Sequence, residues 1–158
     1  MKLLKIAAGL VIIIALGATA HAFSLFGGGP EGEVNTIGTD GVAIKGYDPV
    51  AYFTEGGPHK GKPEYTTEYK GAKWQFSSAK NKELFEANPD KYAPAYGGYC
   101  AYGVAQDALV KIEPDAWTIH KGKLYLNYDQ SVRKSWSENP DGYIEQADQK
   151  WPALTAKQ

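Results

Sequence analysis

The alternation of apolar and polar side chains predicts two β-hairpins in this chain. Aromatic residues and threonines alternate with polar residues over 64–76, and a Lys-Gly pair at 70–71 supplies the turn. The pattern returns over 117–126, where a second Lys-Gly pair at 121–122 separates two apolar stretches. Each hairpin therefore has one face that can be buried.

Helical patterns follow each predicted hairpin. A serine at 77–78 can cap the helix after the first hairpin, which carries Leu84 and Phe85 on its apolar face and ends at the Asn-Pro pair 88–89. After the second hairpin, Asp129 begins one helix and Asn139 begins another. The last of these helices has one apolar face, formed by Tyr143, Ile144, Ala147 and Trp151.

Two shorter elements are expected before the first hairpin. Val42 and Ile44 predict a short strand, and Asp48-Pro49 predicts the start of a short helix over 50–53. Together the elements predict an α+β fold: a small single domain with two β-hairpins and several short helices. Although the order of hairpin, helix and Asn-Pro occurs twice, the sequence alone does not indicate an internal repeat strong enough to matter.

The N-terminal pattern predicts a secretory signal peptide over 1–22. Lys2 and Lys5 precede a run of about 15 mostly apolar residues that ends in small residues suited to cleavage. The run is shorter than the roughly 20 residues of a spanning helix, so an uncleaved anchor is the weaker alternative. We therefore expect a periplasmic or secreted protein with no membrane span in the mature form, a flexible glycine-rich lead-in over 23–39, and a domain with C-terminal helices over 40–152.

The charge of the chain argues against nucleic acid as a partner. The formal net charge is −1, and it becomes −3 if the signal peptide leaves with Lys2 and Lys5. A weakly acidic chain offers no basic surface to hold a phosphate backbone. The aromatic content of 13% is sufficient to give a small domain a substantial core.

Cys100 is the one cysteine of the chain, which makes it the first candidate for chemistry. In an exported protein a single thiol is buried in the core, a ligand, a reactive group or half of an intermolecular disulfide. No lysine, arginine or histidine lies within three residues of it to lower the pKa of its thiol. Tyr99 and Tyr102 flank it and are the candidate contacts for a small cofactor.

His59 and His120 are the candidate partners of Cys100 in a metal site. Neither lies at a spacing typical of zinc sites, so a site built from all three residues requires distant segments to converge in the fold. The sequence has no Gly-x-Ser-x-Gly elbow and no phosphate loop. We therefore predict no catalytic residue and expect that the protein is not an enzyme.

The chain resembles the YHS domain in several ordered segments. These are Asp48-Pro49-Val50, Tyr69-Lys70-Gly71, Trp74-x-Phe76-Ser77-Ser78 and Phe85-x-x-Asn88-Pro89-x-x-Tyr92. The remainder is similar to the exported YHS-domain proteins of bacteria through Tyr96-Gly97-Gly98-Tyr99-Cys100-Ala101, Pro114-x-Ala116-Trp117 and Gly122-Lys123-Leu124-Tyr125-Leu126-Asn127.

The resemblance implies a link to metal handling, especially of copper and other soft or borderline metals. The metal-associated version of the domain carries cysteines at positions that match Ala51, Ser77 and Asn81, and none of these is a thiolate. Metal binding by this chain would therefore depend on Cys100.

Two main functions are consistent with the sequence, and a thiol enzyme or redox sensor is a weaker third. The first is an exported binding module for a metal ion such as copper, or for a small cofactor, held through Cys100. The alternative is a structural or protein-interaction module that docks to a partner in the cell envelope, with Cys100 buried in the core and no metal.

Overall fold

The computed structural model describes residues 32–156 and confirms the predicted α+β fold. The predicted signal peptide lies outside the described residues. The first elements along the chain are η1 (Ala43–Gly46), α1 (Ala51–Thr54), β1 (Lys62–Tyr69), β2 (Ala72–Phe76), α2 (Ala79–Ala87) and α3 (Pro89–Tyr92), where η marks a 3-10 helix. The strands β1 and β2 form the first predicted hairpin.

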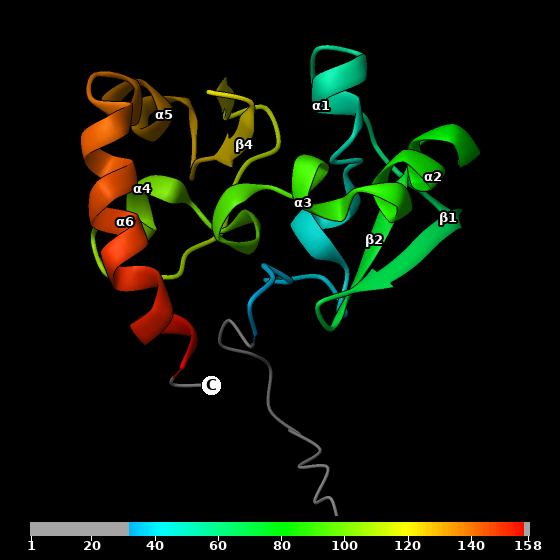
Figure 1. The fold of residues 1–158 in the computed structure, drawn as a ribbon, viewed down its shortest axis with the longest axis horizontal. Helices are drawn as coiled ribbons and strands as arrows, with labels where there is room; N and C mark the ends of the chain where they lie inside the picture. Colours follow the sequence, from blue (N-terminus) through cyan, green and yellow to red (C-terminus); the bar gives the residue numbers. More distant parts are fainter. Residues whose placement is uncertain (1–31, 157–158) are drawn as a thin grey trace, which may run out of the picture.

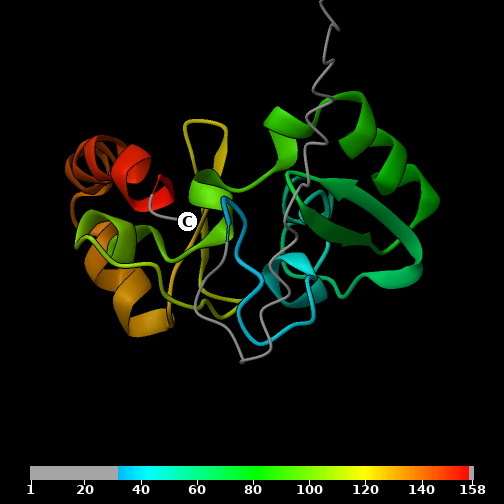
Figure 2. The ribbon, with the colours of Figure 1, turned by 90° about the horizontal axis from the view of Figure 1, so that it is seen from below.

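The same order of elements then occurs a second time. It comprises η2 (Ala95–Gly98), α4 (Ala101–Ala105), β3 (Trp117–His120), β4 (Lys123–Leu126), α5 (Gln130–Ser137) and α6 (Pro140–Thr155). We call residues 43–92 the first repeat and residues 95–155 the second repeat. The two repeats lie side by side in Figure 1, with β1, β2 and α2 on the right and α4, α5 and α6 on the left. Figure 2 shows the same separation from below.

Local details of the backbone show that the repetition extends to single residues. Both hairpin turns consist of a lysine and a glycine with positive φ, at 49° and 76° in the first repeat and 49° and 78° in the second. Two successive residues with positive φ match the twist of a two-residue hairpin turn. Asn88 and Asn139 hold equivalent places before α3 and α6, with ψ of 73° and 66°. The hairpin, helix and Asn-Pro pattern that occurs twice in the sequence therefore corresponds to an internal structural repeat.

In each repeat an equivalent pair of aromatic rings lies between the hairpin and the helix that follows it. The rings of Trp74 and Phe85 lie 5.4 Å apart with an interplanar angle of 30°, and those of Tyr125 and Trp136 lie 5.0 Å apart at 33°. In each repeat a ring from the second strand stacks on a ring from the helix that follows. This contact holds each helix against its hairpin.

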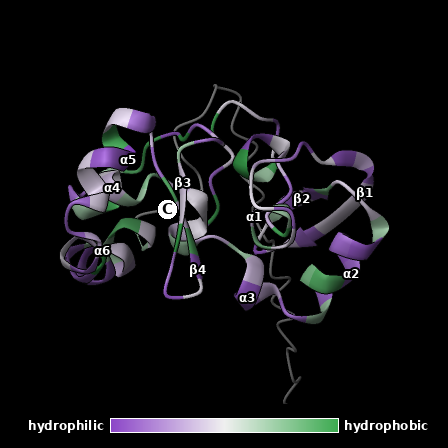
Figure 3. Cartoon of the chain, turned by 90° about the horizontal axis from the view of Figure 1, so that it is seen from above, coloured by the Kyte–Doolittle hydropathy of each residue, from purple (hydrophilic) through white to green (hydrophobic). Residues whose placement is uncertain are grey.

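The apolar core extends across both repeats. The larger cluster contains Trp74 and Phe76 of the first repeat together with Leu124 and Leu126 of the second. A smaller cluster, which includes Tyr99 and Trp136, lies within the second repeat. In Figure 3, α6 turns its hydrophobic residues toward the rest of the molecule and its hydrophilic residues outward. Because the larger cluster joins the repeats, they form one domain.

One expectation near the start of the domain is wrong. The segment around Ile44 is a 3-10 helix and not a strand, because Ile44 and Lys45 have positive φ values that a strand does not allow. The segment before η1 packs against the second repeat: Val34 is 3% exposed, and the Asn35 N–H donates to the carbonyl of Gly97 at 2.9 Å. Among residues 32–156, no helix is long and apolar enough to cross a membrane.

Candidate functional site

Asp48 is the buried polar residue of the first repeat whose side chain accepts the most hydrogen bonds. Its carboxylate is fully buried, and one oxygen, Oδ1, accepts hydrogen bonds from the N–H groups of Val50 at 2.8 Å and Ala51 at 3.2 Å. These bonds satisfy amides at the start of α1, as the Asp-Pro pattern predicts. The other oxygen, Oδ2, accepts from the N–H and hydroxyl of Ser77 and from the side-chain amide of Asn81, at 2.7–2.8 Å.

The positions that match the cysteines of the metal-associated YHS version therefore meet in space. Ala51, Ser77 and Asn81 all contact the carboxylate of Asp48, and we call these four residues the Asp48 cluster. The cluster does not fit a soft metal, because it contains no thiolate and its hydroxyl and amide groups already donate to the carboxylate. Its chemistry is that of a hydrogen-bonded structural anchor between α1, β2 and α2.

Cys100 occupies the place in the second repeat that Asp48 has in the first. Each residue follows a Gly-Tyr pair that ends a 3-10 helix, and each precedes a short helix. The Cys100 side chain is 1% exposed, and its sulfur accepts a hydrogen bond from the Gly103 N–H at 3.3 Å, which caps α4. The thiol also lies 3.6 Å from Oδ1 of Asn127.

The surroundings of Cys100 favour a neutral thiol. Burial raises the pKa of the thiol, and the backbone hydrogen bond from Gly103 opposes this only in part. Apolar residues of the larger core cluster pack in the same region. A neutral, buried thiol is a poor nucleophile and a poor metal ligand.

The two candidate histidines have other partners. His59 lies 3.0 Å from Oε2 of Glu55 on the surface, with 48% of its side chain exposed. His120 is less exposed than its place before a turn predicts: its ring packs against Trp136, and its Nε2 lies 2.7 Å from Oδ1 of Asp141. Within residues 32–156, no three histidine, cysteine, aspartate or glutamate side chains form a group able to hold a metal ion. Cys100, His59 and His120 are therefore not brought together.

The tyrosines proposed as cofactor contacts also have structural partners. Tyr99 is fully buried, its hydroxyl lies 3.3 Å from the carbonyl oxygen of Val34, and burial raises its pKa to about 12. The ring of Tyr102 packs against that of Tyr143 at 5.1 Å.

A cleft between the two repeats brings together side chains that the sequence analysis did not connect. We call it the inter-repeat cleft; its volume is about 280 Å³, just below the roughly 300–1,000 Å³ of small-molecule sites. It is lined by Glu33, Val34, Tyr69, Lys70, Trp74, Asp90, Ala93, Pro94, Ala95, Tyr96, Gly97, Lys123, Tyr125, Asp148 and Trp151. Neither Tyr99 nor Tyr102 lines it.

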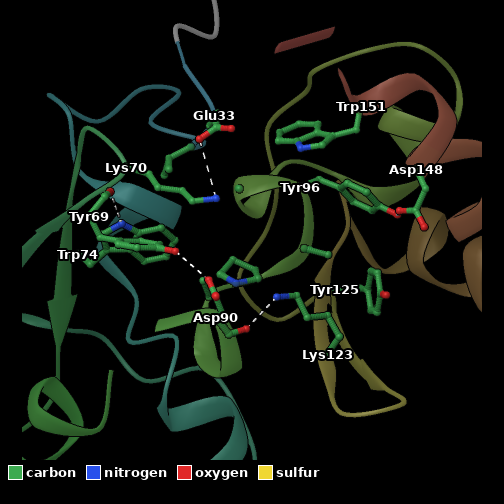
Figure 4. Close-up of a pocket in the computed structure, with 15 residues that line it drawn as sticks. Glu33, Tyr69, Lys70, Trp74, Asp90, Tyr96, Lys123, Tyr125, Asp148 and Trp151 are labelled. Atoms are coloured by element: carbon green, nitrogen blue, oxygen red, sulfur yellow. Dashed lines mark hydrogen bonds and ion pairs between the residues drawn. The ribbon is translucent and has the colours of Figure 1, made fainter. Parts of the chain in front are cut away.

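Aromatic rings line both sides of the cleft, Tyr69 and Trp74 on the side of the first repeat and Tyr96, Tyr125 and Trp151 on the side of the second (Figure 4). The rings of Tyr96 and Trp151 meet edge to face at 5.7 Å. Opposite them, Lys70 extends from the turn of the first hairpin, and Lys123 extends into the cleft from β4, the strand that also carries Tyr125. The site thus depends on the packing of the two repeats against each other.

Tyrosine hydroxyls hold two carboxylates of the cleft. Tyr69 donates to Oδ1 of Asp90 at 3.0 Å, and Tyr96 donates to Oδ1 of Asp148 at 2.8 Å. Burial, followed by the interaction with Asp148, raises the pKa of Tyr96 well above its usual range, so its hydroxyl stays protonated. These bonds fix both carboxylates in place.

The sequence contained only indirect signals of this site. Lys70 and Lys123 lie in two hairpins far apart in the chain, and Trp151 lies on a C-terminal helix whose apolar face predicts core packing. The repeated hairpin pattern is the one signal that could have placed the two lysines in related positions.

Comparisons with known proteins identify one part of the chain. The family model of the YHS domain matches residues 50–96, which correspond to most of the first repeat and the start of the second. Neither the curated proteins nor the solved structures contain a match.

Proposed function

Because this chain carries a YHS domain, we propose that it is an exported binding module that holds a small molecule in the inter-repeat cleft. The observation that supports this most directly is the convergence of aromatic rings and ammonium groups in one cavity between the repeats. Sites between packed units, with an apolar wall and a few polar groups, are typical of ligand binding. In this proposal Cys100 is a core residue that caps α4.

Copper binding through Cys100 has less support from the geometry. The thiol is buried, its sulfur already accepts a backbone hydrogen bond, and His59 and His120 pair with carboxylates elsewhere. A soft metal ion needs a thiolate and further donor atoms around it. The Asp48 cluster supplies hydrogen bonds and no thiolate.

Fragment screening by NMR tests the proposed function. A library of small anionic, neutral and cationic aromatic fragments is added to labelled full-length protein, and backbone amide shifts are mapped. We expect the shifts to gather around Tyr96, Gly97 and Lys123, which line the cleft.

A matched pair of variants separates cleft binding from binding elsewhere. Ala95 lines the cleft, and Ala79 is exposed at the start of α2 outside it. Ala95→Trp should abolish the shifts, whereas Ala79→Trp should leave them unchanged. Shifts centred on Cys100, or no shifts with any fragment, would contradict the proposal; in the second case an interaction module for an envelope partner becomes the better explanation.

A further inference from the structure

Two ammonium groups reach the same cavity from equivalent hairpins. Figure 4 shows Lys70 extending toward the middle of the cleft from the first repeat, opposite Tyr96 and Trp151, and Lys123 extending toward it from β4 of the second repeat. Lys70 lies close enough to Lys123 for its positive charge to lower the pKa of Lys123. Two like charges facing one cavity repel each other, so an anion between them would remove an unfavourable interaction.

The charge of Lys123 is only partly compensated within the protein. It is half-buried, and its ammonium donates to the backbone carbonyl of Asp90 at 3.0 Å, which is a neutral acceptor. Burial lowers the pKa of Lys123, with the carboxylate of Asp90 acting in the opposite direction. An ammonium has three donors, so donors remain for a ligand.

Lys70 is also only weakly paired. Its Nζ lies 3.8 Å from a carboxylate oxygen of Glu33, and both side chains are about half exposed, at 49% and 54%. Such surface pairs contribute little and rearrange readily. A ligand carboxylate can therefore replace Glu33 as the partner of the Lys70 ammonium with little loss of free energy.

The carboxylates of the cleft are less available to a cation. Asp90 and Asp148 each accept a hydrogen bond from a tyrosine hydroxyl, and in Figure 4 Asp148 lies beyond Tyr96 as seen from the lysines. The third carboxylate, Glu33, is paired with Lys70, so each carboxylate of the cleft has a partner within the protein, whereas the two ammonium groups keep donors for a ligand. This arrangement favours an anion over a cation.

The aromatic wall indicates the rest of the ligand. Trp151 and Tyr96 offer ring surface on the side of the cleft opposite Lys70. Flat apolar groups stack on such rings with favourable packing. The volume of about 280 Å³ favours a small molecule.

We propose that the inter-repeat cleft binds a small carboxylate that carries a flat apolar or aromatic group. Its carboxylate would lie between Lys70 and Lys123, and its flat group would pack against Trp151 and Tyr96. This inference rests on the proposed function and adds the chemical class of the ligand.

Three probes of nearly equal shape and different charge test the inference. Benzoate, benzamide and benzamidinium are titrated into the full-length protein by calorimetry. We expect benzoate to bind at least about tenfold more tightly than the neutral amide, because charge-assisted hydrogen bonds form only with the carboxylate. Benzamidinium should bind more weakly still.

Lysine variants identify the residues responsible. Lys70→Met combined with Lys123→Met should weaken benzoate binding by at least about tenfold and remove its advantage over benzamide. Lys121→Met is the matched control, because Lys121 is the equivalent of Lys70 in the second hairpin, is 72% exposed and does not line the cleft. The control should bind benzoate as the wild type does. Lys70→Met alone, at an exposed position, keeps the test valid if the double variant fails to fold.

The outcomes distinguish this inference from the proposed function. Equal or tighter binding of benzamidinium, or benzoate binding that is unaffected by the lysine changes, overturns the inference. If fragments bind in the cleft without preference for the anion, the proposed function stands and the ligand class is wrong. If no fragment of any charge binds there, both are wrong.

Discussion

Asp48 and Cys100 show how one backbone position can be filled by different chemistry in the two repeats. Both residues cap the first turn of a short helix after a Gly-Tyr pair. The carboxylate of Asp48 also joins β2 and α2 through Ser77 and Asn81. The thiol of Cys100 accepts one backbone bond at 3.3 Å and lies against Asn127. The lone cysteine is thus explained by its place in the repeat, without invoking a ligand.

Replacement of the Asp48 carboxylate should destabilise the protein strongly. In Asp48→Asn, an amide nitrogen would face N–H donors that now bind Oδ1 or Oδ2, so buried donors would lose their acceptor. We expect the free energy of unfolding to fall by about 3 kcal/mol, measured by urea denaturation. Asp40→Asn, at an exposed position, should change it by less than about 0.5 kcal/mol. Equal effects of the two substitutions would contradict the role given to Asp48.

The Cys100 thiol should be unreactive in the native protein. Since the side chain is 1% exposed and burial raises the pKa of its thiol, we expect labelling by a thiol reagent at neutral pH only as fast as the protein unfolds. Labelling in urea should then be rapid and complete. Fast labelling of the folded protein at a rate typical of a free thiol would show that Cys100 is accessible and would revive a role for it as a ligand.

The short elements depend on close backbone approaches that only glycine permits. Gly97, within η2, has φ of 59°, and a Cβ there would lie 1.6 Å from the carbonyl oxygen of Glu33. Gly41 has φ of 77°, but a Cβ there would meet nothing within 4 Å. A side chain at Gly41 therefore meets only the cost of positive φ, whereas a side chain at Gly97 also meets a steric clash with the backbone of Glu33.

Alanine at these two glycines should give very different stabilities. Gly41→Ala should lower the free energy of unfolding by about 1 kcal/mol, through conformation alone. Gly97→Ala should lower it by more than about 3 kcal/mol, because the segment around Glu33 must leave its place beside the second repeat. Thermal denaturation of the pair measures the difference. Similar melting temperatures for both variants would show that this segment is not firmly packed.

The sequence predicted those elements whose pattern is local. Alternation and Lys-Gly turns identified both hairpins, and Asp129 and Asn139 marked the starts of α5 and α6. The β-branched residues Val42 and Ile44 favour an extended backbone, so the local pattern predicts a strand there. No local sequence signal predicts the positive φ values of Ile44 and Lys45. The inter-repeat cleft was not predicted, since its walls come from hairpins and a helix that meet only through packing between the repeats.

At the scale of the whole molecule, buried phenols and the buried thiol should make stability fall at alkaline pH. Burial raises the pKa of Tyr52 and Tyr96 well above the usual range, raises that of Tyr99 to about 12, and raises that of Cys100. Above pH ~9 the unfolded chain therefore releases protons that the folded chain retains, which favours unfolding. Lys123 acts in the opposite direction, because its pKa is lowered.

Urea denaturation at several pH values checks the alkaline effect. The free energy of unfolding should be nearly constant from pH ~7 to ~8 and should decrease steadily as pH rises from about 9 to 11, through the ordinary pKa values of cysteine and tyrosine. Tyr99→Phe removes one of these groups and should make the decrease less steep. A stability that is flat or rises over that pH range would contradict the burial of these hydroxyls.

The two repeats should unfold together, although each contains a complete set of similar elements. The larger core cluster combines Trp74 and Phe76 with Leu124 and Leu126, so separation of the repeats would expose apolar surface from both. Domains with one shared core unfold in a single cooperative transition. We therefore expect fluorescence from Trp74 and from Trp136, each isolated by replacing the other tryptophans with phenylalanine, to report the same urea midpoint.

The independence of the repeats can be tested directly by shortening the chain. A fragment of residues 32–94 lacks Leu124, Leu126 and the cysteine-containing segment that complete the larger cluster, so it should show no cooperative unfolding transition. A folded fragment, or two separate midpoints for Trp74 and Trp136 in the full chain, would show that the repeats are independent units. The inter-repeat cleft would then lie between two units that move independently. A ligand bound there stabilises only the state in which both walls of the cleft are folded, so it should bring the urea midpoints of Trp74 and Trp136 together.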